Sequence, residues 1–227
     1  MRLDRARLIT YLVWSTWAGI AFFSVYPTLN WLTAMRSHTY RCHFDWELNT
    51  PFVPHFIWAY LSMYALFLPP PLFMEPPALR ALGQQTVWGT LVSGLIFLLF
   101  PATLGFPRVL PDDPYVDELY RKMFALDQPH NLVPSLHVVW SGAIALAVCD
   151  SVGRWGRWFF LAWLGLIGLS TLLVHQHHLA DVVVALTLVA FLRKVLGGTK
   201  HVAAHPAGFD RGVDAEPRRG TDGGTGP

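Results

Sequence analysis

Apolar residues along this chain gather in long stretches that contain no Asp, Glu, Lys or Arg. Five such stretches cover residues 8–35, 48–74, 81–107, 128–149 and 158–180. A helix needs roughly 20 apolar residues to cross the hydrocarbon core of a bilayer. Each stretch is therefore long enough for one membrane-spanning helix, and a shorter apolar run after Asp181 supplies a sixth.

The pattern predicts an all-α, polytopic membrane protein with one domain over residues 1–196. The predicted spans cover about 8–32, 54–74, 83–105, 134–152, 158–174 and 178–197. Tyr115 to Leu126, between the third and fourth spans, has the pattern of a short surface helix. Residues 197–227 are rich in glycine with scattered charges, which predicts a disordered cytoplasmic tail.

Charge narrows the class of protein and orients it. Charged residues make up 14% of the chain, whereas roughly 25% is usual for a soluble domain. A net charge of +2 gives no reason to expect nucleic acid as a partner. With both termini inside, the inner segments carry twelve of the Lys and Arg residues and the outer loops five. Because cytoplasmic loops are the more basic ones, we expect cytoplasmic termini in a plasma (inner) membrane. Cys42 and Cys149 then lie on opposite faces and cannot form a disulfide.

Two polar stretches, residues 127–137 and 170–181, interrupt the apolar pattern at what would be the outer face. His177 and Asp181 are four residues apart, so on a helix they share a face. A carboxylate there can accept a hydrogen bond from one imidazole nitrogen and leave the other as a nucleophile. In the first stretch, His137 can donate a proton to a leaving oxygen, and a helix that begins at Pro134 offers free N–H groups to an anion. The two stretches together predict a site for a phosphate ester.

At these residues the chain resembles the type 2 phosphatidic acid phosphatase superfamily, which includes the vanadium haloperoxidases. The second family motif, Pro-Ser-x-His, is met at positions 134, 135 and 137, and the third by Ser170, His177 and Asp181. The resemblance covers roughly residues 50–196. It implies a six-helix core, no metal cofactor, His177 as nucleophile, Asp181 as its orienting partner and His137 as the acid and base.

The chain departs from that family in two places. Thr171 stands where the third motif usually has a phosphate-binding Arg, and the first motif, with its Lys and Arg, is absent. The pair Ser170-Thr171, Asn131 and the stretch Glu47 to Pro54 look more like the branch that holds the fungal inositol phosphorylceramide synthases. That branch transfers a lipid head group instead of hydrolysing it.

The phosphate-binding residues are expected to be Ser135, Ser170, Asn131 and Arg108, with Arg108 replacing the missing cations. Each has a simpler interpretation. Ser135 could only cap a helix, Asn131 could only shape a turn, and Arg108 could extend to the membrane interface. Arg121 and Lys122 are further candidate cations.

The sequence thus predicts a membrane-embedded lipid phosphate phosphatase that acts on a lipid phosphate or pyrophosphate at the outer face. The alternative within the superfamily is a lipid head-group phosphotransferase. From another class, a metal or haem membrane protein could use His175, His177, His178 and Asp181 as ligands, and a catalytically inactive scaffold is a third hypothesis. For His175 and His178 the simpler interpretation is an interfacial role. The lipid and the oligomeric state are not specified by the sequence.

Overall fold

The computed structural model describes residues 4–197, so the predicted tail lies outside the described part except for Gly197. That part is helical, with one isolated bridge between Tyr40 and Ala102. In chain order the helical segments are α1 (Arg5–Ala34), η1 (Asp45–Asn49), η2 (Pro54–Phe56), α2 (Ile57–Leu61), η3 (Ser62–Phe67), α3 (Pro70–Phe73), α4 (Pro76–Leu99), α5 (Pro114–Leu126), α6 (Leu136–Cys149), α7 (Arg154–Leu173) and α8 (Leu179–Leu196).

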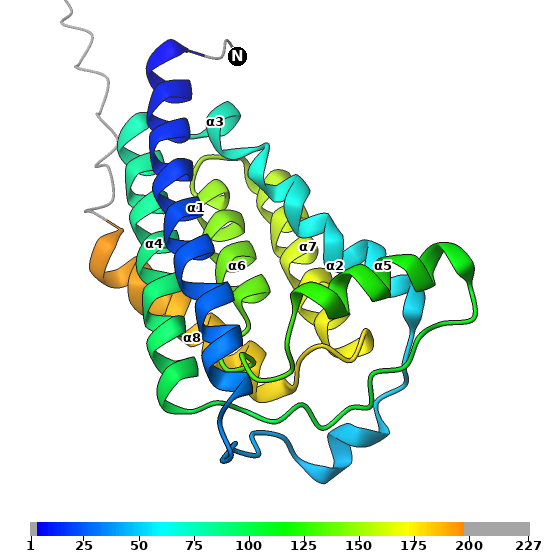
Figure 1. Cartoon of the computed structure of the whole chain (residues 1–227). Coiled ribbons are helices and arrows are strands. Elements are labelled where there is room, and N and C mark those ends of the chain that lie inside the picture. Colours follow the sequence, from blue (N-terminus) through cyan, green and yellow to red (C-terminus); the bar gives the residue numbers. More distant parts are fainter. Residues whose placement is uncertain (1–3, 198–227) are drawn as a thin grey trace, which may run out of the picture.

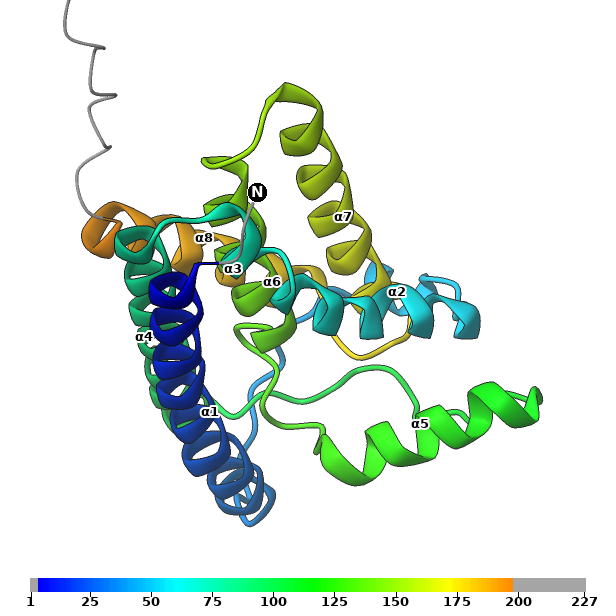
Figure 2. The same cartoon turned by 90° about the horizontal axis from the view of Figure 1, so that it is seen from above.

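The long helices form a bundle with α6 at its centre (Figure 1). Helices α1 and α4 lie side by side, and α6 packs on α4, α7 and α8. Helix α5, predicted as a surface helix over Tyr115–Leu126, is confirmed as a helix and lies across the bundle axis (Figures 1 and 2). The fold is therefore an α bundle with one transverse helix.

Three helices, α1, α4 and α7, are long and apolar enough to cross a membrane. Helix α6 is apolar but has only 14 residues, which is about 21 Å at 1.5 Å per residue against a hydrocarbon core of about 30 Å. Helix α8 has 18 residues and carries Asp181, Arg193 and Lys194. The described structure thus supports a membrane protein with three candidate spans.

The second predicted span, 54–74, is not one regular helix. It is divided into η2, α2, η3 and α3. Proline explains both ends of this division. Pro54 begins η2, and Pro69 to Pro71 remove backbone N–H donors where η3 would otherwise continue. The segment still packs along α7 (Figure 1). It belongs to the bundle as a series of short helices that alternate between 3-10 and α geometry.

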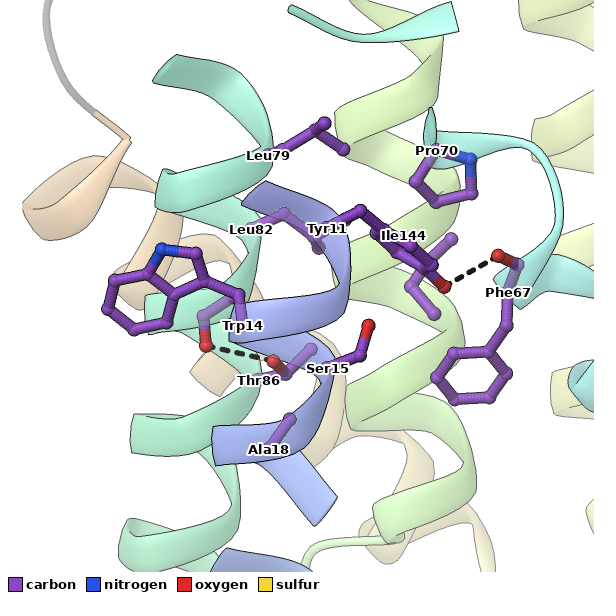
Figure 3. A pocket seen from close by; sticks show the side chains of 11 residues that line it. Tyr11, Trp14, Ser15, Ala18, Phe67, Pro70, Leu79, Leu82, Thr86 and Ile144 are labelled. Carbon is purple, nitrogen blue, oxygen red and sulfur yellow. Dashed lines mark hydrogen bonds between the residues drawn. The ribbon is translucent and has the colours of Figure 1, made fainter. Parts of the chain in front are cut away.

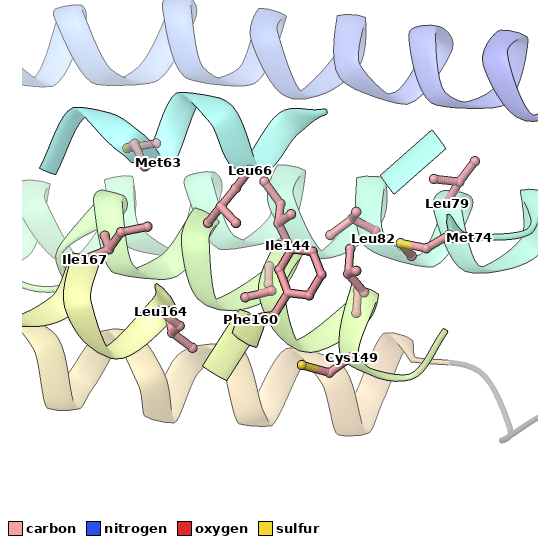
Figure 4. Close-up of a cluster of buried hydrophobic side chains, with 14 residues drawn as sticks. Met63, Leu66, Met74, Leu79, Leu82, Ile144, Cys149, Phe160, Leu164 and Ile167 are labelled. Carbon is pink, nitrogen blue, oxygen red and sulfur yellow. The ribbon is translucent and has the colours of Figure 1, made fainter. Parts of the chain in front are cut away.

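Apolar side chains fill the end of the bundle that holds the start of α4 and the end of α6. Figure 4 shows this cluster, in which Leu66, Leu82, Ile144, Phe160 and Ile167 come from η3, α4, α6 and α7. A second cluster joins Leu29, Phe97, Val139 and Val189 toward the other end. The folded state is stabilised roughly in proportion to the apolar area that it buries. These two clusters therefore hold α6 between its neighbours.

Helices α1 and α4 approach closely because α4 carries glycine at the contact. A Cβ on Gly83 would overlap the Trp14 side chain, and one on Gly94 would overlap Val25. Small residues permit such close approach between helices in a membrane, where packing rather than water exclusion drives association. The outer surface of α1 is apolar; Trp17 and Phe23 are 56% and 74% exposed. A surface of this kind suits lipid better than water.

The loops that carry the two predicted polar stretches meet at one end of the bundle (Figure 1). Helix α5 packs there through Val116, Tyr120 and Met123, which lie at helical spacing on one face. These residues contact Ile57 and Tyr60 of α2. Helix α5 thereby fixes the position of α2 next to the polar stretches.

Candidate active site

His177 and Asp181 are paired as the sequence predicts. His177 lies in the turn between α7 and α8, and its Nδ1 is 3.1 Å from Oδ2 of Asp181 in the first turn of α8. The same oxygen accepts the backbone N–H of His178 at 2.9 Å. Asp181 is fully buried and His177 is 6% exposed. A buried carboxylate of this kind fixes the imidazole and leaves its Nε2 as the reactive nitrogen.

The start of α6 is joined directly to the start of α8. The backbone N–H of Ser135 donates to the carbonyl of Asp181 at 3.2 Å. Ser135 is the N-cap of α6, where its hydroxyl accepts the N–H of Val138 at 3.4 Å. The interpretation of Ser135 as a helix cap is therefore confirmed, and the cap stands next to the His177–Asp181 pair.

This junction brings the two histidines of the predicted site together. The ring centres of His137 and His177 lie 6.2 Å apart. His137 Nδ1 is 3.1 Å from the hydroxyl of Tyr60, whose ring packs on the imidazole at 4.0 Å between centres. In both rings the Nδ1 atom is the one that contacts a protein partner, Tyr60 for His137 and Asp181 for His177.

A second carboxylate lies near His177. Asp127 follows α5, and its Oδ1 accepts the Tyr26 hydroxyl at 2.5 Å. Burial raises the pKa of this carboxyl, while the Tyr26 hydrogen bond and the nearby His177, Arg108 and Tyr60 act to lower it. Asp127 is thus a carboxyl group at the C-terminal end of α5 that lies near His177.

Arg108 is held at the C-terminal end of α5. Its Nη1 donates to the carbonyl of Phe124 at 3.1 Å and its Nη2 to the carbonyl of Asp127. The guanidinium also lies over the Phe124 ring, 4.8 Å from its centre. Burial lowers the pKa of this group, and the Asp127 charge raises it. Arg108 therefore caps α5 and places its positive charge near Asp127, with its phosphate-binding role still a prediction.

Asn131 and Ser170 have partners inside the protein. Asn131 donates to the side chain of Asn30 at 2.7 Å and accepts from Thr33 at 3.0 Å, which ties its loop to the end of α1. Ser170 is buried in α7 and donates to the carbonyl of Ile167 at 2.6 Å. Of the predicted residues, the structure brings together His137, His177, Asp181 and Ser135, and it leaves Asn131 and Ser170 in structural contacts.

His175 and His178 are packed into the loop between α7 and α8, and each has a hydrogen-bond partner inside the protein. His175 stacks on Phe106 at 3.9 Å, and its Nε2 is 2.9 Å from the carbonyl of Thr50. His178 is 1% exposed and accepts the N–H of Gly105 at Nε2, at 3.0 Å.

The three imidazoles of this loop therefore have separate partners. Across residues 4–197, no group of three or more His, Cys, Asp or Glu side chains is arranged to hold a metal ion. The ligand cluster that the sequence allowed is not assembled in this part of the chain.

A cavity lies elsewhere, near the first halves of α1 and α4 (Figure 3). Its lining includes Trp14, Ser15, Phe67 and Leu82, and Tyr11 donates to the carbonyl of Phe67 at 2.6 Å. The lining is mostly apolar and includes none of the residues of the histidine turn between α7 and α8. Its hydroxyl groups are those of Tyr11, Ser15 and Thr86, and the lining residues include no histidine and no carboxylate.

Sequence reasoning did not assign a role to Tyr60 or Asp127. Tyr60 stands in an apolar stretch, where an aromatic residue usually only packs. The tyrosine itself is the signal that could have been used, because a buried phenol usually has a hydrogen-bond partner and Tyr60 lies in a stretch expected to be buried. Asp127 opens the first polar stretch and directly precedes the apolar window 128–149. No family model matches the chain, and neither the curated proteins nor the solved structures contain a match.

Proposed function

We propose that this protein is an integral membrane enzyme that hydrolyses a lipid phosphate ester through a phosphohistidine on His177. One observation carries the proposal: the Ser135–Asp181 backbone hydrogen bond joins two distant polar stretches, so that His137 and His177 lie 6.2 Å apart between ring centres. The two rings are close enough for both to contact one small tetrahedral group. One of them is oriented by a buried carboxylate.

In the first half-reaction, Nε2 of His177 attacks phosphorus, the N–P bond forms, and the bond from phosphorus to the lipid oxygen breaks. His137 gives a proton to that oxygen, so the lipid leaves as a neutral alcohol. Asp181 stabilises the positive charge that develops on the His177 ring. In the second half-reaction, water gives a proton to His137 and attacks phosphorus, which releases phosphate and restores both rings.

The start of α6 supplies donors for the phosphoryl oxygens. The N–H groups of Leu136 and His137 belong to the first turn and have no acceptor within residues 4–197. Helix N-termini bind anions through such groups and the helix dipole, and phosphoryl transfer depends on positioned donors more than on covalent chemistry. Arg108 adds positive charge at longer range, through its position beside Asp127.

The membrane arrangement follows from the same proposal. We infer that the six apolar segments, the shorter α6 and α8 and the divided segment 54–74 included, cross or enter the bilayer as a superfamily-like core. The site end then faces outward from the plasma membrane, as the Lys and Arg distribution favours. The chain would be a divergent member of the type 2 phosphatidic acid phosphatase superfamily, and the quoted motifs support this assignment.

Transfer of the phosphoryl group to a polyol is the second candidate function. It is favoured by the shielding of His177, which is 6% exposed and thus poorly accessible to bulk water. The stretch Glu47 to Pro54, which resembles the transferase branch, also contacts the end of α7 and the turn that follows it. The Val53 N–H donates to the Leu173 carbonyl at 2.9 Å, and the Thr50 carbonyl lies 2.9 Å from His175 Nε2. A transferase needs such a shielded site, because a bound alcohol must outcompete water.

The test is product partition with purified protein in detergent. Labelled phosphatidic acid, prenyl phosphate, diacylglycerol pyrophosphate and a phosphoinositide are supplied in turn, with and without excess inositol or glycerol. We expect labelled inorganic phosphate from at least one donor, and none from His177→Ala. If a labelled polyol phosphate or a new phospholipid dominates, the protein is a transferase. If no donor turns over, or if His177→Ala is as active as the wild type, the proposed function is wrong.

A further inference from the structure

Tyr60 makes the contact that fixes the second histidine. It lies in α2 with 2% of its surface exposed, in a segment that sequence reasoning treats as plain membrane span. Its hydroxyl is 3.1 Å from Nδ1 of His137, and the two rings lie 4.0 Å apart with their planes 30° from parallel. The phenol therefore constrains both the position of the imidazole and the nitrogen that remains free.

Packing alone does not account for a tyrosine here. The neighbours of Tyr60 in its cluster are the apolar side chains of Ile57, Val116, Met123 and Val174 together with Tyr120. A phenylalanine would fill the same space, and a buried hydroxyl without a partner is costly. Within residues 4–197, the direct hydrogen-bond partner of the Tyr60 hydroxyl is His137. The hydroxyl therefore makes a contact with that ring that a phenylalanine could not make.

Asp127 is a charged group close to Tyr60. The carboxyl is held by Tyr26 at 2.5 Å, and Tyr60 and His177 both act to lower its pKa against the effect of burial. The carboxyl of Asp127 therefore lies near both Tyr60 and His177. A phenol that gives its own proton toward a carboxylate keeps its lone pairs for an imidazole N–H.

We propose that Tyr60 is the positioning residue for His137: its oxygen accepts Nδ1–H and reserves Nε2 for proton exchange with the substrate. Tyr60 does for His137 what Asp181 does for His177, with a neutral phenol in place of a charged carboxylate. The His137 ring can then both give and take a proton, as the two half-reactions require. The catalytic part of this inference rests on the proposed function, whereas the hydrogen bond itself does not.

The hydrogen bond is tested on the protein without turnover. Histidine labelled with ¹⁵N in the ring is incorporated into the wild type and into Tyr60→Phe, and the His137 signals are assigned by their loss in His137→Gln. We expect the neutral His137 ring of the wild type to carry its proton on Nδ1. Tyr60→Phe should show an averaged mixture of the two tautomers. Tyr120→Phe is the matched control, because Tyr120 is a fully buried tyrosine of the same cluster with only a 3.4 Å contact to the Pro54 carbonyl.

The catalytic consequence is measured as a pH–rate profile on the donor that the wild type hydrolyses. In Tyr60→Phe we expect kcat to fall roughly 10- to 100-fold, less than the full contribution of an acid–base group, with KM little changed. The alkaline limb should move to lower pH by about half to one unit, since the protonated ring loses one hydrogen bond. An unchanged tautomer in Tyr60→Phe would overturn the inference, as would an unchanged profile. Absence of wild-type turnover on every donor would refute the proposed function alone, because the tautomer still decides the role of Tyr60.

Discussion

A single oxygen of Asp181 organises the histidine turn. Oδ2 is 3.1 Å from His177 Nδ1 and accepts the His178 N–H at 2.9 Å. The carboxylate therefore orients the imidazole and caps α8 at once. The Asp181 carbonyl accepts the N–H of Ser135, which adds the start of α6 to the same residue. The His177–Asp181 pair and the junction between two helices are thus one structural unit.

We predict that Asp181→Asn keeps the fold and loses most of the rate. The amide can still accept one hydrogen bond, but it cannot stabilise a positively charged His177 ring. In serine proteases, the change from Asp to Asn beside the catalytic histidine costs about 10⁴-fold in kcat, and we expect the same direction here. Turnover and the thermal unfolding temperature are compared with Asp112→Asn, an exposed carboxylate outside the site. A rate close to that of the wild type would make Asp181 a purely structural residue.

The turn between α7 and α8 shows how an element is shaped by its contacts. His175 has a φ of 56°, in the left-handed region that glycine usually fills after a helix end. This conformation costs roughly 1–2 kcal/mol for a residue with a Cβ. The contacts of His175 with Thr50 and Phe106 offset that cost. They make the loop conformation depend on the segment 48–54 as well as on its own residues.

We predict that this loop loses stability as pH falls from about 6.5 to about 4. Burial lowers the pKa of His178 to about 4; Asp181 and Glu47 oppose this, and His43 and His177 add to it. A histidine whose folded pKa lies below its ordinary value of about 6.5 is protonated first in the unfolded chain, so acid favours unfolding. The thermal unfolding temperature should therefore fall across this window.

The variant that checks this is His178→Gln, whose side-chain oxygen can still accept the Gly105 N–H. Its unfolding temperature should depend less steeply on pH between 6.5 and 4 than that of the wild type. The other titratable groups of the loop are the same in both proteins. Equal slopes would mean that His178 does not titrate with unfolding.

Sequence predicts the elements better than their ends. The predicted spans locate α1, α6, α7 and α8 to within a few residues. Helix α4 begins at Pro76, seven residues before the predicted start, because Pro76 and Pro77 suit the first turn of a helix, whereas the uncharged window begins only after Arg80. The hydrophobic pattern also did not reveal that segment 54–74 is divided into several short helices. Hydrophobicity reflects how favourably a segment transfers into lipid, and it carries no information on whether the helix is continuous.

Site prediction fails where a side chain depends on a distant element. The His177–Asp181 pair is local in sequence, and its spacing was enough to predict it. Arg108 caps α5 from the preceding loop, 16 residues from its partner Phe124, and Asn131 is bound by the end of α1. Neither contact has a local signal. Tyr60 was missed for the same reason, since its partner His137 is 77 residues away.

For the whole molecule, the loops with the candidate site lie at one end of the bundle and the basic turn before α7 lies at the other (Figure 1). Charge alone suggests which end is outside, because twelve of the Lys and Arg residues fall at the inner end or in the tail. The orientation decides which leaflet can supply the lipid substrate.

We predict that the site end is outside the cell. Single cysteines at Asp112, in the loop before α5, and at Ser151, before α7, are placed in a Cys42→Ser background, since Cys42 is itself partly exposed. An impermeant thiol reagent should label Asp112→Cys in intact cells and Ser151→Cys only after lysis. The reverse pattern would invert the topology.

The most direct test of the account is capture of the phosphorylated enzyme. Purified protein in detergent is mixed with a labelled lipid phosphate that it hydrolyses, quenched in alkali, and assayed for protein-bound phosphate that acid releases. The account predicts such phosphate on the wild type, on His177 by peptide mapping, and on His55→Ala, which alters an exposed histidine. It predicts none on His177→Ala, which should also have no more than trace turnover. Full turnover by His177→Ala, or equal labelling of it, would contradict the phosphohistidine mechanism.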